Sequence, residues 1–117
     1  MKKRLLVANQ HVVLGELIIT NMDFPWVLGS FVAYAEFEKY KELFALEIYL
    51  TTEIDDIEER LDHGIDSLEE ELERLESAKE KVESETQSLN LVSLDPESNE
   101  EVRILTIHID KDKFDYR

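Results

Sequence analysis

The pattern of apolar and polar residues changes its period along the chain. Over residues 4–8, 12–20 and 27–34, aliphatic and β-branched side chains form short runs separated by polar turns. Such runs are typical of strands. Three strands with short connections predict an antiparallel meander over residues 1–34. Gly15, inside the second run, indicates a bulge or a close backbone approach.

Beyond residue 35 the apolar positions take a helical spacing. They fall on one face of a helix predicted over residues 36–50, at Phe37, Tyr40, Leu43, Phe44 and Ile48. We expect this helix to end at residues 51–53. Thr52 can then cap a second helix, with Asp55 at its third helical position.

A heptad repeat dominates the middle of the chain. Apolar residues recur every seven positions, at Ile54, Leu61, Leu68, Leu75 and Val82. This repeat predicts a long acidic helical segment within residues 36–89. Unbroken, residues 53–88 would extend about 54 Å, further than a sheet of about 25 Å could cover. Gly64 fits the position just past a helix end, so we expect a kink or break there.

The apolar stripe narrows along this segment. Residues 54–68 carry a broad apolar face that suits a core, whereas residues 69–83 carry a narrow seam, at Leu72, Leu75, Ala78 and Val82. Narrow seams are typical of helix–helix pairing. We therefore expect residues 65–83 to pack in a helical hairpin or across a homodimer interface.

Strand patterns return in residues 90–117. Residues 91–94 predict a short strand, residues 102–109 a central strand with two apolar faces, and residues 114–116 a last short strand. The prediction is a single α+β domain over residues 1–117. Its antiparallel sheet has about five to six strands, made of the N-terminal meander and the C-terminal strands, and packs against two to three helices.

The net charge of −15 comes from one part of the chain. Residues 53–101 hold 19 acidic and 4 basic residues, and the remainder is balanced. A negative field repels nucleic acids and anionic membranes and attracts basic protein surfaces or cations. The alternative is that the charge only keeps an exposed helix soluble.

The sequence also limits the compartment. There is no cysteine, which excludes disulfides, thiolate metal sites and cysteine nucleophiles. The apolar run that follows Arg4 stops at Asn9, too early for an export segment. No stretch approaches the length needed to span a bilayer. We expect a cytoplasmic protein that binds neither nucleic acid nor membrane.

No catalytic or metal-binding pattern emerges. The histidines, His11, His63 and His108, share no ligand spacing. Asp110 and Asp112 begin like a calcium loop, but Phe114 occupies the fifth position. Phosphate-binding glycine loops, a nucleophile elbow and Glu-x-x-His are all missing from the sequence. We expect no enzymatic activity, no cofactor and no metal.

Trp26 is the single tryptophan, and it follows Asp23-Phe24-Pro25 in a connection between predicted strands. Tryptophan is enriched at binding hot spots, so Trp26 could form an aromatic contact surface. The structural interpretation, which we favour, is that it closes one end of the core.

These residues also carry a resemblance. The pattern G-x-L, D-x-P-W, F, I-H-I-D and F-x-Y-R resembles a family of small uncharacterised bacterial proteins, over about half of the chain at both its ends. It is carried by residues 15–17, Asp23-Phe24-Pro25-Trp26, Phe31, Phe37-Glu38, Leu43-Phe44, Ile107-His108-Ile109-Asp110, Phe114 and Tyr116-Arg117. Lys111 stands where the family usually has glycine. The resemblance implies a shared α+β fold and no catalytic residue.

Two main classes of function fit this sequence. The first is a non-enzymatic acidic interaction module, similar to an inhibitor, immunity protein or regulator, that binds a basic protein partner. Its candidate contact residues are Trp26, Leu68, Leu72, Leu75, Val82, Glu69, Glu73 and Glu76. The second is a ligand-binding or enzymatic domain with a pocket between sheet and helices near Trp26, Tyr34 and His108. A structural homodimer is a third possibility.

Overall fold

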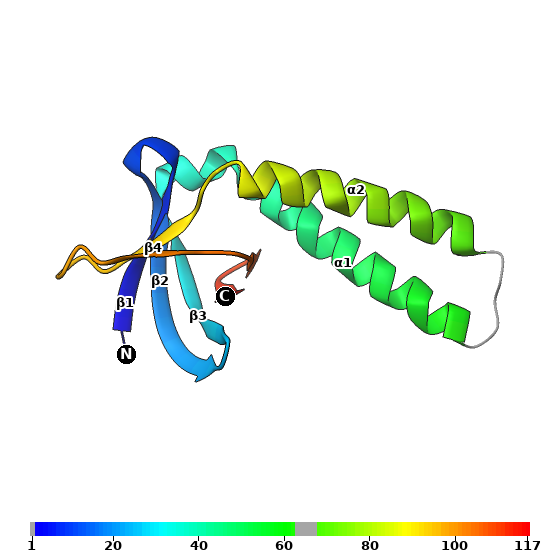
Figure 1. Ribbon diagram of the computed structural model, residues 1–117, viewed down its shortest axis with the longest axis horizontal. Coiled ribbons are helices and arrows are strands. Elements are labelled where there is room, and N and C mark those ends of the chain that lie inside the picture. Colours follow the sequence, from blue (N-terminus) through cyan, green and yellow to red (C-terminus); the bar gives the residue numbers. More distant parts are fainter. Residues whose placement is uncertain (1, 63–67) are drawn as a thin grey trace.

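The computed structural model describes residues 2–62 and 68–117, and combines one seven-stranded antiparallel sheet with a helical hairpin (Figure 1). The molecule measures 53 × 28 × 20 Å because the hairpin extends beyond the sheet. The strands are β1 (Lys2–Ala8), β2 (Val12–Asp23), β3 (Trp26–Ala33), β4 (Val92–Leu94), β5 (Glu101–Arg103), β6 (Ile107–Asp110) and β7 (Lys113–Tyr116). The helices are α1 (Lys41–Asp62) and α2 (Glu69–Gln87), with 3-10 turns η1 (Asn9–His11) and η2 (Ala35–Lys39).

The sheet has the order β5-β4-β1-β2-β3-β7-β6. The predicted meander is confirmed as β1, β2 and β3, and the two later hairpins add to its opposite sides. Gly15 lies beside a bulge, since Leu6 pairs with Gly15 whereas Val7 pairs with Val13. A Cβ at Gly15 would also come within 2.5 Å of the Val32 carbonyl oxygen. Both features predicted for this glycine are therefore present.

The sheet curls until its two edge strands approach each other. Only residues 104–106 join β5 to β6, although these strands lie at opposite ends of the sheet order. That link spans at most about 15 Å, whereas the edges of a flat seven-stranded sheet lie about 29 Å apart. The Tyr116 hydroxyl of β7 also donates to Ser93 Oγ of β4 at 3.2 Å, across the three strands between them.

The prediction of one central strand over residues 102–109 is wrong. This segment forms the two edge strands, β5 and β6. The sheet therefore has seven strands, where we predicted five to six. The alternation of apolar and polar residues indicates which faces of a strand are buried. It does not indicate that residues 104–106 pass from one edge of a curled sheet to the other. The last predicted strand is confirmed as β7.

Aromatic packing ties the hairpin to the sheet. Phe31 of β3 meets Phe37 of η2 with ring centroids 4.9 Å apart, and Phe37 stacks on Phe44 of α1 at 5.5 Å. Phe44 is 1% exposed and belongs to the same buried cluster as the sheet residues. The cluster includes Leu6, Leu14, Leu17, Phe31, Phe37, Phe44, Ile107, Ile109, Phe114 and Tyr116.

One cation is buried among the strands. Arg4, 5% exposed, donates from Nε to Ser93 Oγ at 2.6 Å and from Nη2 to the carbonyl oxygens of Ser93 and Glu100 at 2.9 and 3.2 Å. These bonds join β1 to β4 and to the turn that follows it. Burying a charge is unfavourable unless its donors are satisfied. Arg4 therefore specifies how the outer strands dock.

The first helix is longer than predicted. α1 runs without interruption through residues 51–53, where we expected one helix to end and another to begin. Thr52 does not cap, because its hydroxyl donates to the Ile48 carbonyl oxygen at 2.9 Å, one turn back within the helix. The buried stripe continues past this point through Leu50, Ile54 and Ile57. Residues 36–40, expected to be helical, form η2 and the turn after it.

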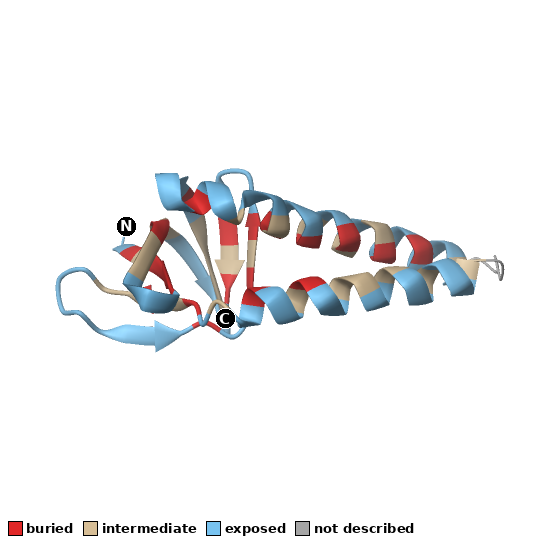
Figure 2. Ribbon diagram, turned by 90° about the horizontal axis from the view of Figure 1, so that it is seen from above, coloured by how far each residue is buried: buried red, intermediate tan, exposed pale blue. Residues whose placement is uncertain are grey.

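The heptad segment divides into two helices that pack on each other. The buried positions of α1 lie along the hairpin (Figure 2), and α2 contributes Val82 and Thr86. The expected break at Gly64 lies outside the described residues, but α1 ends before it and α2 begins after it. Among the described helices, none is long and apolar enough to cross a membrane.

The close packing of β2 against β3 can be tested at Gly29. Its Cβ would overlap the carbonyl oxygen of Ile18 and approach the Phe114 ring to 3.0 Å. We expect Gly29→Ala to lower the free energy of unfolding by about 2 kcal/mol or more, because a backbone atom must shift. Ser30→Ala, at the exposed neighbouring position, is the control for urea denaturation and should change stability little. Equal effects of both changes would contradict this packing.

Candidate functional site

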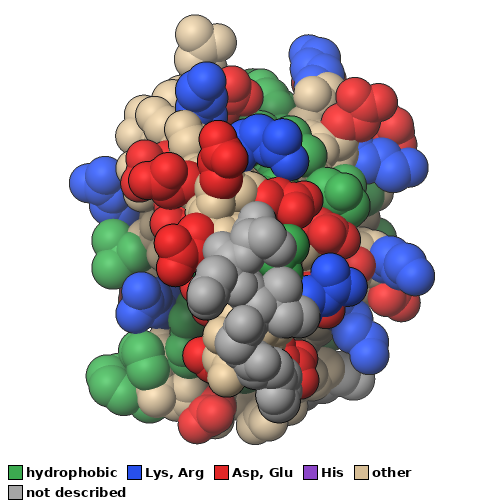
Figure 3. Space-filling view, turned by 90° about the vertical axis from the view of Figure 1, so that its right-hand side faces the viewer, with side chains coloured by type: hydrophobic (Ala, Val, Ile, Leu, Met, Phe, Trp, Pro, Cys, Tyr) green, Lys and Arg blue, Asp and Glu red, His purple; other side chains and the backbone are tan. Residues whose placement is uncertain are grey.

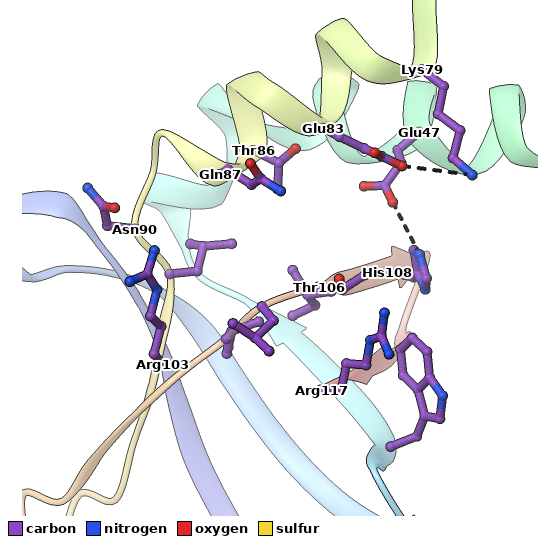
Figure 4. Close-up of a pocket in the computed structure, with 15 residues that line it drawn as sticks. Glu47, Lys79, Glu83, Thr86, Gln87, Asn90, Arg103, Thr106, His108 and Arg117 are labelled. Atoms are coloured by element: carbon purple, nitrogen blue, oxygen red, sulfur yellow. Dashed lines mark ion pairs between the residues drawn. The ribbon is translucent and has the colours of Figure 1, made fainter. Parts of the chain in front are cut away.

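A cleft of about 560 Å³ opens where the base of the hairpin faces the link between β5 and β6 (Figure 4). α1 and α2 form its upper wall in this view, and residues 103–108 form its lower wall. The volume is within the usual range for small-molecule sites. Its charged residues are Glu47, Lys79, Glu83, Arg103, His108 and Arg117.

His108 is held between two carboxylates. Its Nε2 lies 3.2 Å from Glu47 Oε1 of α1, and its Nδ1 lies 2.7 Å from Asp115 Oδ1 of β7. Asp115 is in place because it pairs directly with His108 in the β6–β7 register. The bond to Glu47, with the help of Asp115, raises the pKa of His108 to about 9, although burial opposes the shift. The ring is therefore an imidazolium that donates from both nitrogens.

Glu47 explains why this histidine matters to the fold. Its side chain is 5% exposed, and a buried carboxylate needs a charged or hydrogen-bonding partner. The Glu47–His108 pair therefore connects α1 to β6 at the point where the hairpin leaves the sheet (Figure 4).

Trp26 lies at the rim of the cleft. Its ring stacks on His108 with centroids 5.8 Å apart and planes at 25°, and the Arg117 guanidinium carbon lies 5.2 Å from the ring centroid. Both neighbours are cations, which an indole ring attracts. Trp26 is half-buried and is not part of the buried core cluster. Trp26 therefore neither closes the core nor forms an open contact surface. It is a rim residue that contacts two cations.

Two arginines give the cleft its free positive charge. In the cleft, Lys79 forms an ion pair with Glu83 at 3.8 Å, and His108 forms one with Glu47. Among the described residues, neither Arg103 nor Arg117 takes part in an ion pair. Both arginines extend from the sheet side toward the helices (Figure 4). The cleft is therefore cationic in a protein whose net charge is −15.

The candidate contact residues of the helical segment fall on two surfaces. Val82 is buried, Leu68, Leu72 and Leu75 are half-buried, and α2 packs on α1. The acids of the set face solvent, at Glu69, Glu73 and Glu76. The seam of α2 is thus used within the chain, and the acidic face remains accessible.

The other candidates lie apart from the cleft. Tyr34 donates its hydroxyl to Glu16 Oε2 at 2.7 Å and does not line the cleft, whereas Trp26 and His108 do. His11 is exposed in η1, and His63 lies outside the described residues. Within residues 2–62 and 68–117, no group of three or more acidic residues and histidines is placed to hold a metal ion.

Sequence reasoning missed Glu47, Asp115, Arg103 and Arg117. Glu47 had a usable signal, because it is an acidic residue between Phe44 and Leu50 on the apolar face of a helix. The arginines gave none, since only the curl of the sheet brings them to one cleft. Comparison of the chain with protein-family models, curated proteins and solved structures found no match.

The His108 joint makes a pH-dependent contribution to stability. The folded pKa of about 9 exceeds the ordinary 6.5, so the contribution is complete below about pH 6.5 and is lost as the pH rises through 9. We expect His108→Gln to lower the free energy of unfolding by about 1–2 kcal/mol near pH 6, allowing for the ring's 30% exposure. The stability difference from wild type should shrink toward pH 10.

Urea unfolding at several pH values measures this difference, and His11→Gln, at an exposed position, is the matched control. A difference that stays constant from pH 6 to pH 10 would show that the imidazolium charge contributes nothing to the joint.

Proposed function

We propose that the protein is a non-enzymatic interaction module whose helical hairpin binds a basic surface of a protein partner. The observation that carries this proposal is the projection of α1 and α2 beyond the sheet, which leaves their outer faces open to solvent (Figure 1). A partner can approach these faces without displacing any part of the described chain.

The charge of the hairpin supports a basic partner. α1 and α2 hold 16 acidic and 5 basic residues, and Glu47 is the only one of these acids that is buried. Three basic residues form local ion pairs, Arg60 with Asp56 at 3.3 Å, Arg74 with Glu71 at 3.6 Å and Lys79 with Glu83. Most carboxylates are left without a cation. Asp and Glu side chains gather over the hairpin end in Figure 3.

Two exposed apolar side chains in the first half of α1 provide an anchor for the partner. Leu46 and Tyr49 of α1 are 44% and 58% exposed, and their spacing of three places them on one face of the helix. Interfaces commonly combine a few aromatic or aliphatic anchors with a polar rim. A partner that fits this surface has Lys or Arg residues around a small apolar depression.

The first test is capture of partners from a lysate at about 50 mM and about 500 mM salt, conditions between which charge screening increases steeply. A partner that binds the hairpin through charge should be basic, and should be recovered only at the lower salt concentration. Capture alone does not identify the surface, so the captured protein is purified and titrated against variants.

The variant E69Q/E73Q/E76Q removes three exposed charges from α2. We expect it to weaken binding about tenfold, because exposed charge pairs contribute about 0.2–1 kcal/mol each. The matched control, E97Q/E100Q/E101Q, removes three exposed charges near β5 and should bind like wild type. Equal weakening by both variants, or binding that does not change with salt, would refute the proposed role of the hairpin.

A further inference from the structure

The two arginines of the cleft lie at its opposite ends (Figure 4). Arg103 lies at one end, near Asn90, and Arg117 lies at the other end, near His108. A guanidinium is a strong and directional donor for carboxylate groups. One anionic group cannot contact both arginines, so the arrangement fits two anionic groups that are held apart within one ligand.

The wall between the arginines is formed by the link from β5 to β6. Residues 104–106 follow Arg103 directly, and Thr106 lies between the two arginines in Figure 4. At the far end of the link, Thr106 exchanges two backbone bonds with Arg117, of 3.0 and 3.2 Å. The amide of Leu105 donates to the Arg117 carbonyl oxygen at 2.7 Å. This short link therefore fixes how far apart the two arginine backbones lie.

The link presents an apolar surface to the cleft. Leu105 is 67% exposed, whereas its neighbour Ile104 is 7% exposed and Leu91 is 4% exposed. All three residues line the cleft. An exposed leucine is stabilised when an apolar group covers it and removes its surface from water. A ligand that reaches both arginines along this wall therefore has a hydrocarbon middle.

The carboxylates that line the cleft do not oppose such a ligand. Glu47 and Glu83 are each paired with a cation of the same cleft. At the other end, the neutral amides of Gln87 and Asn90 line the cleft with Arg103 (Figure 4). The remaining acids of the hairpin are exposed, and at physiological ionic strength the field of an exposed charge falls off within about 8 Å.

From this geometry we infer that the cleft binds an elongated dianion, a hydrocarbon chain with a carboxylate at each end. One carboxylate lies against Arg103 and the other against Arg117, and the chain between them covers Leu105 and Ile104. This site is separate from the acidic face of the hairpin, and either could fail experimentally without the other.

The test compares straight-chain dicarboxylates with the monocarboxylates of equal length, from succinate and butyrate through suberate and octanoate to dodecanedioate and dodecanoate. Each pair shares its hydrocarbon chain, so the ratio of the two dissociation constants isolates the contribution of the second carboxylate. Trp26 is the only tryptophan, and the Arg117 guanidinium carbon lies 5.2 Å from its ring centroid, so its fluorescence reports binding.

We expect the advantage of the dicarboxylate to depend on chain length, because the two arginines are a set distance apart. It should be largest at one length greater than that of succinate, and at least about tenfold there, equivalent to ~1.4 kcal/mol. At that length, a dicarboxylate with ether oxygens in its chain should bind more weakly, because it covers Leu105 with polar atoms.

The changes R103Q and R117Q should each remove the advantage of the second carboxylate, because only one carboxylate then meets a guanidinium. R74Q, on the outer part of the hairpin, makes the same change in net charge and should keep the advantage. Calorimetric titration checks the result for R117Q, whose contact with Trp26 itself influences the fluorescence.

The inference is overturned if no dicarboxylate exceeds its monocarboxylate match, if the advantage is the same at every chain length, if the ether chain binds as tightly, or if none of the probes binds. It is also overturned if R103Q keeps the advantage or if R74Q removes it. The comparison of probes on the unaltered protein decides the matter even if a variant fails to fold. None of these measurements depends on whether the hairpin binds a basic protein.

Discussion

The three-residue link between β5 and β6 constrains the whole architecture. Because residues 104–106 cannot cross the width of a flat sheet, the sheet has to curl until its edges approach each other. The curl brings β4 and β7 within hydrogen-bonding distance through Ser93 and Tyr116, and it forms the interior in which Arg4 is buried. It also sets Arg117 beside the link through backbone bonds. The cleft is thus a consequence of sheet closure.

The attachment of the hairpin combines two interactions of different strength. Burial of the Phe44 side chain contributes about 1.5–3 kcal/mol. The Glu47–His108 pair contributes less than its Coulomb attraction suggests, because both groups lose water when they are buried. The aromatic contact therefore supplies most of the affinity of α1 for the sheet. The ion pair, held in register by Asp115, selects one orientation of the helix, because a buried Glu47 without a partner is strongly unfavourable.

The fold was predictable wherever one local signal decided the outcome. The meander and the final hairpin strand follow from side-chain alternation and turn residues. The division of the heptad segment follows from the unfavourable exposure of a very long apolar stripe. α1 passes through Thr52 because burial of Ile54 and Ile57 outweighs the weak capping signal. The split of residues 102–109 could not be predicted, because alternation is the same in a central strand and in two collinear edge strands. For the same reason, Arg103 and Arg117 looked like ordinary surface residues.

The cleft and the exposed face of the hairpin share one helix, α1, which raises the question of whether a change at one is felt at the other. Glu47, in the cleft, is two positions before Tyr49, on the outer face of α1. Coupling between two sites requires an element with two arrangements whose equilibrium both ligands shift. Movement of α1 on the sheet would remove Phe44 from its aromatic stack and leave Glu47 buried without His108. Both costs oppose such movement, so the base of the hairpin acts as a fixed joint that holds α1 in one orientation on the sheet.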